Sequence, residues 1–266
     1  MTKSLKFLLV LAIGTGVLTF QSCKTGKDNP PEPNNTNDPI LECYITEQTE
    51  SFPSRSTITY LYNDLDQVSN AIIGDDTTKF VYEDNKLISA YRGTEFSEFI
   101  YEAGSSEIQR INQKENGTDQ GYILVTNENG QIAKVETHTT TSGEDVTETI
   151  TNITYVNGKI TELTTEQYNP STSAFVTQFS LTSVETDDNI NPLSNKVAYF
   201  FMNTQNPKAY GDNNIIKGTA TIQGFPASYT AAIEYNTNNY PTAINASITN
   251  AAGTVPSNTS LTYNCK

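Results

Sequence analysis

The sequence has no tryptophan, a single histidine and only three cysteines, and its basic residues are few. One histidine cannot build a zinc site that needs two, so His138 is not expected to hold a metal. Lysine and arginine together number 16 against 30 aspartates and glutamates, which leaves a formal charge of −14. This acidity repels phosphate backbones, and it excludes nucleic acid as an expected partner.

Long hydrophobic runs are also missing. A transmembrane helix needs about 20 consecutive apolar residues, whereas the longest apolar stretch, residues 5–20, is shorter and is interrupted at residues 14–16. Lys3 and Lys6 precede this stretch, which is the pattern of a cleaved export signal. We therefore predict a signal peptide over residues 1–22 and no helical membrane span in the rest of the chain.

The end of this signal, Ser22-Cys23, resembles a bacterial lipobox, although Phe20 and Gln21 differ from the residues commonest there. The resemblance implies that Cys23 is acylated and holds the chain at the outer membrane, on its periplasmic face or at the cell surface. The alternative is an ordinary secretory signal that merely lies next to Cys23. Residues 23–40 are rich in proline and asparagine, so we predict a flexible, lipid-anchored tether.

The other two cysteines, Cys43 and Cys265, lie at the two ends of the remaining domain, residues 41–266. Both stand in alternating, strand-like stretches. In an exported chain such a pair indicates a disulfide, and a disulfide would make the first and last strands neighbours. Two buried free thiols are the alternative.

A loosely repeated pattern runs through this domain: an alternating strand that ends near tyrosine, a polar turn, and a second strand that begins with an aliphatic residue. Asn129-Gly130 and Asn157-Gly158 are strong hairpin signals within it. Helical periodicity is nearly absent, except that residues 197–202 are expected to form a short helix or plug-like loop. We predict an all-β fold, a long antiparallel β-meander of roughly a dozen strands curled into a barrel or half-barrel. Six examples of the pattern begin at Ile58, Phe80, Phe99, Tyr122, Ile153 and Ile233.

This meander is expected to be soluble rather than membrane-spanning. A membrane barrel needs an apolar, lipid-facing residue at every second position of each strand. Residues 136–141 and 161–166 offer no such apolar face.

The tyrosine-turn-aliphatic pattern, together with Asn191-Pro192-Leu193 and Tyr240-Pro241, resembles that of Bacteroidetes lipoproteins of unknown function that have a porin-like fold. The resemblance implies a curled antiparallel meander in the cell envelope. It implies no activity.

Residues that carry chemistry are few, and each has a plainer interpretation. His138 lies in a threonine-rich strand, and no Gly-x-Ser-x-Gly turn accompanies it. Paired carboxylates could serve a glycosidase or bind calcium, but they stand in turns, where Asp and Asn bond the local backbone. Asp76-Thr77-Thr78 also resembles an O-glycosylation site of exported Bacteroidetes proteins, and a turn is again the preferred interpretation. The pairs are Asp75/Asp76, Glu83/Asp84 and Asp187/Asp188.

Aromatic residues are plentiful, with 15 tyrosines and 11 phenylalanines. Alternate positions of a strand share a face, so Tyr60, Phe80 and Phe99, like Tyr62, Tyr82 and Tyr101, are predicted to align. The stripe is interpreted as core in preference to a sugar-binding platform. We expect a non-enzymatic, lipid-anchored envelope protein without catalytic residue, metal or cofactor, which binds a glycan or protein partner. The alternatives are a structural or adhesin-like surface protein and, less favoured, a glycan-active hydrolase.

Overall fold

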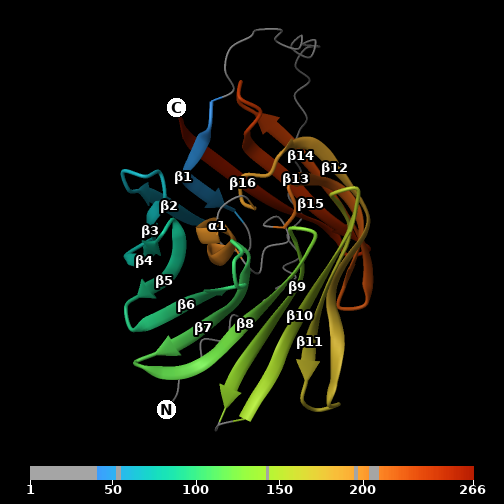
Figure 1. The fold of residues 1–266 in the computed structure, drawn as a ribbon. Helices are drawn as coiled ribbons and strands as arrows, with labels where there is room; N and C mark the ends of the chain where they lie inside the picture. The colour runs from blue at the N-terminus through green and yellow to red at the C-terminus, as the bar shows by residue number, and fades with distance from the viewer. Residues whose placement is uncertain (1–40, 52–54, 142–143, 195–196, 204–209) are drawn as a thin grey trace. The chain divides into compact units, whose positions relative to one another are not determined.

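The structure, a computed structural model, describes residues 41–51, 55–141, 144–194, 197–203 and 210–266. These residues form sixteen antiparallel strands and one short helix, in which each strand pairs with its neighbours in the sequence. The last strand pairs with the first, so the sheet is a closed barrel (Figure 1). The predicted all-β meander is confirmed, and its curl is complete. No helix within the described ranges is long and apolar enough to cross a membrane.

The strands fall into a short set and a long set. The first seven have six to eight residues each: β1 (Cys43–Glu50), β2 (Ser56–Tyr62), β3 (Val68–Ile73), β4 (Asp76–Glu83), β5 (Lys86–Arg92), β6 (Glu95–Tyr101) and β7 (Ile108–Glu115). The others have ten to seventeen residues: β8 (Thr118–Glu128), β9 (Gln131–Thr141), β10 (Glu144–Val156), β11 (Lys159–Asn169), β12 (Ala174–Ile190), β13 (Asn213–Ile222), β14 (Phe225–Tyr235), β15 (Pro241–Asn250) and β16 (Gly253–Cys265).

The tyrosine-turn pattern of the sequence corresponds to a bulged hairpin. The pairing register shifts next to Tyr62, Tyr82, Tyr101 and Tyr155, so each of these tyrosines follows a β-bulge. A tyrosine hydroxyl then satisfies a backbone carbonyl of a neighbouring strand: Tyr101 donates to Leu87 at 2.9 Å and Tyr155 to Ile132 at 3.0 Å. In these two cases the bulged hairpin gains a hydrogen bond from the next tyrosine along the barrel.

The turns between these strands use the residues that their backbone requires. Asn129-Gly130 joins β8 to β9 and Asn157-Gly158 joins β10 to β11, and all four residues have positive φ. Asparagine and glycine tolerate that conformation best, and it suits the twist of a two-residue hairpin. Both predicted hairpins are confirmed.

A plug fills one end of the barrel. Helix α1 (Val197–Met202) presents Ala198, Tyr199 and Phe200 to the core that the inward strand residues form. The ring of Phe201 lies edge-on to those of Phe80 and Phe99, with centroids 6.4 Å and 5.2 Å away. The expected short helix is confirmed, and it supplies apolar volume that side chains of a wide barrel would not reach on their own.

Buried polar contacts fix this plug to the first two strands. The bulge in β1 leaves the Ile45 amide to donate to the Tyr199 hydroxyl at 3.2 Å, and Tyr62 bonds the same hydroxyl. Next to it, Gln48 donates to Asn203 at 3.0 Å and accepts from Tyr60 at 3.2 Å. Each buried polar group in this region thus has a partner, which an apolar interior demands.

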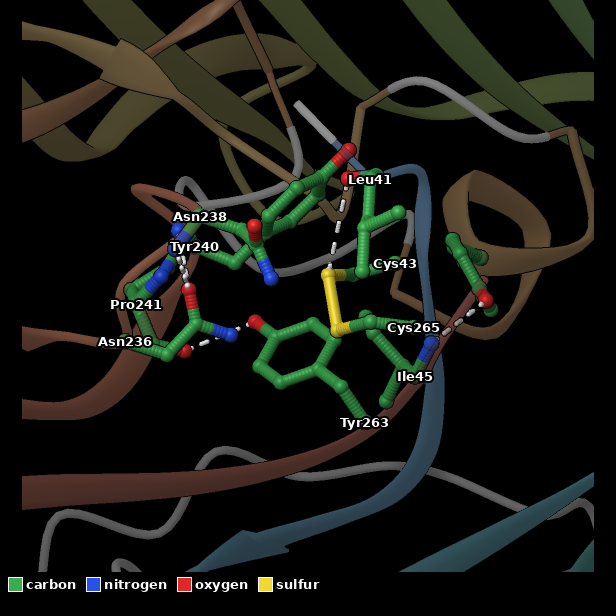
Figure 2. The surroundings of a disulfide bond; sticks show 10 residues. Leu41, Cys43, Ile45, Asn236, Asn238, Tyr240, Pro241, Tyr263 and Cys265 are labelled. Carbon is green, nitrogen blue, oxygen red and sulfur yellow. Dashed lines mark hydrogen bonds between the residues drawn. A yellow bond between two sulfur atoms is a disulfide. The ribbon is translucent and has the colours of Figure 1, made fainter. Parts of the chain in front are cut away.

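A disulfide joins Cys43 of β1 to Cys265 of β16, as predicted, across the seam where the barrel closes (Figure 2). Tyr263 lies beside it and donates to the Pro241 carbonyl at 2.7 Å. The bond closes a loop of 222 residues, which is almost the whole domain.

At the end away from the plug, the long strands extend past the core. No residue from Thr164 to Ser180, and none from Thr221 to Asn239, is buried. The inward residues of β14, such as Tyr229 and Ile233, are only half-buried. The barrel therefore has one packed end and one end whose side chains remain accessible.

Alkaline pH is expected to unfold this barrel. Burial raises the pKa of Tyr229 from the usual 10.0 to about 12, and burial also raises the pKa of Tyr60, Tyr199 and Tyr210. The native state holds these protons more tightly, so the stabilisation is complete below pH 10 and is lost as the pH rises above it. Tyrosinate absorbance and circular dichroism should change together above pH 10; full ionisation with the sheet intact would contradict this.

The disulfide is expected to stabilise the domain strongly, because a cross-link over a long loop restricts the unfolded chain. The Cys43→Ala/Cys265→Ala variant should lose about 2–5 kcal/mol of unfolding free energy in urea titrations. Cys23→Ser, outside the barrel, is the control and should leave the midpoint unchanged. Equal stability of the double variant and the oxidised parent would refute this role.

Candidate functional site

The predicted aromatic stripe lies in the core. Tyr60, Phe80 and Phe99 are buried, and Tyr62, Tyr82 and Tyr101 pack against them from partly buried positions. The rings face the plug, so they are not a platform for a ligand. The core interpretation is confirmed.

His138 lies on the outer face of β9, where its ring stacks on Tyr122 of β8 with centroids 4.4 Å apart. The Arg110 guanidinium covers the other side of Tyr122 at 3.6 Å. Asp145 accepts from the Tyr122 hydroxyl and contacts His138 Nδ1 at 3.2 Å. The hydrogen bond from Tyr122 lowers the pKa of Asp145, and the same bond raises that of Tyr122.

This arrangement is not a catalytic triad. A triad places the carboxylate on one ring nitrogen and the nucleophile on the other. Here the only hydroxyl bonded to the ring, that of Thr147 among the described residues, lies 3.3 Å from Nδ1, the nitrogen that also contacts Asp145. Nε2 is buried and has no partner within the described structure. The stacked cluster is best explained as cross-strand packing that covers the outer wall of β7–β10.

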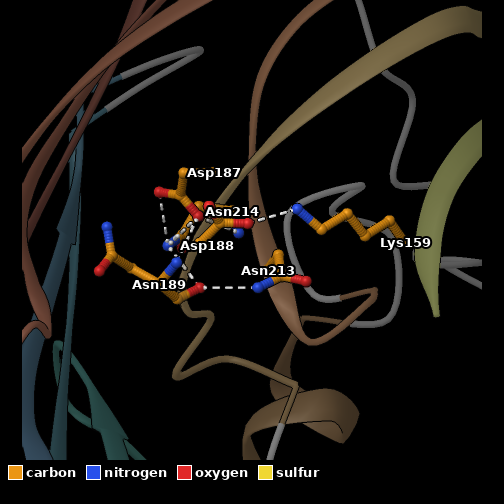
Figure 3. Close-up of polar contacts among 6 residues, drawn as sticks. All are labelled: Lys159, Asp187, Asp188, Asn189, Asn213 and Asn214. Carbon is orange, nitrogen blue, oxygen red and sulfur yellow. Dashed lines mark hydrogen bonds and ion pairs between the residues drawn. The ribbon is translucent and has the colours of Figure 1, made fainter. Parts of the chain in front are cut away.

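The Asp187/Asp188 pair is divided between two tasks (Figure 3). Asp187 accepts from the backbone amides of Asn189 and Asn214, both at 3.1 Å, and from the Tyr235 hydroxyl. Asp188 points away and pairs with Lys159, whose hydrogen bond lowers the Asp188 pKa. One carboxylate is thus occupied by donors and the other by a cation, so the pair does not face a common substrate.

The other carboxylate pairs lie in exposed turns or at strand ends. Asp75 and Asp76 stand at the β3–β4 turn, and Glu83 and Asp84 at the β4–β5 turn. Thr78 of the resembled glycosylation motif is buried. Across the part of the chain that the structure describes, no group of three or more His, Cys, Asp or Glu side chains could hold a metal. Cys23 and the predicted tether lie outside the described residues.

Shallow, open depressions lie where β12 begins, at the accessible end of the barrel. Two adjoining depressions, of about 260 and 840 Å³, share Val176 and Gln178, and we call them together the β12 groove. The β11–β12 register shifts here because Gln178 is an extra residue in β12. A bulge of this kind leaves one residue unpaired, bends the strand and re-aims its side chains. The groove is lined by Gln167, Tyr168, Asn169, Pro170, Phe175, Val176, Thr177, Gln178, Ser180, Thr221, Gln223 and Gly224.

The composition of the β12 groove is distinctive, because none of its lining residues is charged. Amides and hydroxyls provide hydrogen-bond donors and acceptors, while the rings of Tyr168 and Phe175 lie with centroids 5.6 Å apart. Phe175 is 37% exposed and Val176 43%, high values for such side chains. The groove combines apolar surface with neutral polar groups, the composition that small-molecule sites share.

Sequence reasoning missed this groove. Of the strands that form it, only β11 follows a tyrosine-turn pattern, whereas β12 and β13 have no such signal. Exposure of Phe175 also depends on how far β12 extends beyond the plug. The available signal was local: residues 167–180 contain two glutamines and no charge.

Comparison with known proteins supports the fold. A porin-like protein from Bacteroides uniformis superposes with a TM-score of 0.55 at 12% identity, covering 83% of this chain and 96% of that one. A porin-like protein from Bacteroides vulgatus gives a TM-score of 0.41 at 9% identity over 84% and 99% of the two chains. No protein-family model and no curated protein matches the sequence.

The two halves of the Asp187/Asp188 pair should respond differently to substitution. Asp187→Asn puts an amide donor against groups that already donate, and it should cost about 1–3 kcal/mol of unfolding free energy. Asp188→Asn, the matched control, removes an exposed ion pair and should leave the urea midpoint unchanged. Equal effects of the two substitutions would show that Asp187 is not the anchor of this corner.

Proposed function

We propose that this chain is a non-enzymatic, lipid-anchored protein of the cell envelope that binds a neutral glycan in the β12 groove. The observation that carries the proposal is the groove itself: an uncharged, amide-lined hollow with exposed aromatic rings on a chain of net charge −14.

Glycan chemistry fits these side chains. A sugar offers many hydroxyl groups, which both donate and accept hydrogen bonds. The side-chain amides of Gln167, Gln178 and Gln223 can also both donate and accept. The apolar C–H faces of a sugar ring pack on aromatic surfaces, which Tyr168 and Phe175 supply. A neutral ligand also avoids repulsion by the acidic chain.

The cell-envelope location rests on the sequence. The segment that ends at Ser22-Cys23 has the features of an export signal with an acylation site, and the disulfide between Cys43 and Cys265 is the kind that persists outside the cytosol. Outward positions of β14–β16 carry Ser, Thr and Asn, such as Ser228, Asn245 and Thr254. The polar groups of these side chains would lack hydrogen-bond partners in the hydrocarbon of a membrane. We infer that the barrel stands in water beside the membrane, held through Cys23.

A non-enzymatic role is favoured by the side chains that an enzyme would need. His138 is packed on the outer wall, and Asp187 is saturated by donors. A structural or adhesin-like role is the competing proposal, and it differs in needing no glycan.

The test is calorimetric titration of the full chain carrying Cys23→Ser, which removes the acylation site. Cello-, malto- and manno-oligosaccharides should bind, and acidic oligogalacturonate should not. Phe175→Ala and Gln178→Ala should each weaken binding by about tenfold, or ~1.4 kcal/mol.

Tyr91→Ala is the matched control, because Tyr91 is similarly exposed, at 44%, but lies on β5. It should bind like the parent. If no neutral glycan binds, or if the Phe175 and Gln178 variants bind as tightly as the parent chain, the proposal is rejected and the adhesin-like role is favoured.

A further inference from the structure

The wall of the barrel next to the β12 groove is almost free of charge. From Gly218 to Cys265 the sequence contains one charged residue, Glu234, in a chain that has 46. The rest of the outer surface differs: Lys134 and Glu136 form an ion pair on β9, and Lys159 and Asp188 form another beyond it. The weakly charged surface therefore belongs to the end of β13 and to β14–β16, and the ion pair between Lys217 and Glu185 lies at its border on β13 and β12.

Small hydroxyl and amide side chains cover this wall. Residues that pair across a sheet share a face. Most outward positions of β14–β16 carry small polar side chains, with Pro226, Ala232, Ala243 and Pro256 between them. Thr230 and Ser247 bond each other at 3.0 Å, as do Thr249 and Thr254, so these side chains are held by their neighbours. The wall consists of Thr219, Ser228, Thr230, Asn245, Ser247, Thr249, Thr254, Asn258 and Ser260.

This wall is continuous with the β12 groove. Ser180 and Thr221, which pair across β12 and β13, both line the groove. Thr221 then pairs with Pro226 of β14, and the next outward pair along the same two strands is Thr219 with Ser228. From β12 to β16 there are four strand spacings, or ~19 Å of neutral surface.

We propose that the ligand is a polymeric neutral glycan, one part of which occupies the groove while the following sugar units lie across the β13–β16 wall. This inference rests on the proposed function. A protein partner fits less well, since the centres of protein interfaces are enriched in aromatic residues and arginine and depleted in serine and alanine. An anionic polymer would find no basic side chain between Gly218 and Cys265 and would be repelled by Glu234, and Lys217 at the border is already paired with Glu185.

The experiment compares short and long chains of one glycan series. The full chain carrying Cys23→Ser is titrated with a disaccharide and with a hexasaccharide from each of the cello-, malto- and manno-oligosaccharide series. The hexasaccharide should bind at least about tenfold more tightly, because only it reaches the wall.

Ser247→Lys places a bulky charge in the wall on β15 and should abolish most of that gain while disaccharide affinity is unchanged. Thr230→Lys, beside Lys217, is a second variant. Thr126→Lys, an exposed outward threonine on β8, is the matched control and should retain the gain. Thermal melting verifies that each variant folds.

The outcomes separate the two proposals. If disaccharide and hexasaccharide bind equally and both wall variants behave like the parent, the polymer inference is overturned and the groove remains a glycan site. If no glycan binds the parent chain at all, the proposed function fails and the inference fails with it.

Discussion

The fold depends on a hydrogen bond that the first strand cannot make within its own sheet. Where β1 bulges after Ile45, the amide of that residue is buried and donates to the hydroxyl of Tyr199 from the plug helix. An unsatisfied buried amide would cost about 1–3 kcal/mol. Through this contact the plug helix provides the hydrogen-bond partner of the β1 amide, and β1 in turn fixes the position of the helix. The aromatic contacts between Phe80, Phe99 and Phe201 then fill the packed end of the barrel.

Much of this architecture could be predicted from the sequence, because its local chemistry is strong. Asn-Gly pairs indicate hairpins, and alternation of apolar and polar residues indicates strands. Two cysteines at the domain ends indicate that the first and last strands are neighbours. The six tyrosine-turn patterns correspond to β2–β11, β14 and β15, which is twelve strands. The four strands without that signal are β1, β12, β13 and β16. They hold the barrel's closure and its groove, where pairing is decided by distant partners instead of a tight turn.

The candidate site could not be predicted in the same way. Its residues have ordinary strand identities, and they form a groove only because β12 continues past the packed end and bulges at Gln178. Exposure of Phe175 is a consequence of strand length relative to the plug, a property of the assembled barrel. Conversely, the residues that drew chemical interest in the sequence, His138 and Asp187, are occupied in packing and in anchoring a corner. In this chain the ionisable residues that resemble catalytic groups have structural roles, whereas binding is proposed for a stretch of uncharged residues.

The seam disulfide has a mechanical consequence. If the chain is anchored through Cys23, a pulling force reaches the barrel at the start of β1, where Cys43 is the first residue. The bond to Cys265 carries that tension directly into the last strand, so the load is shared by both edges of the seam before any ladder hydrogen bond is stretched. Without it, β1 could be peeled from its neighbours one pair at a time. With it, a load on the domain can pass to the N-terminal segment while the barrel remains closed.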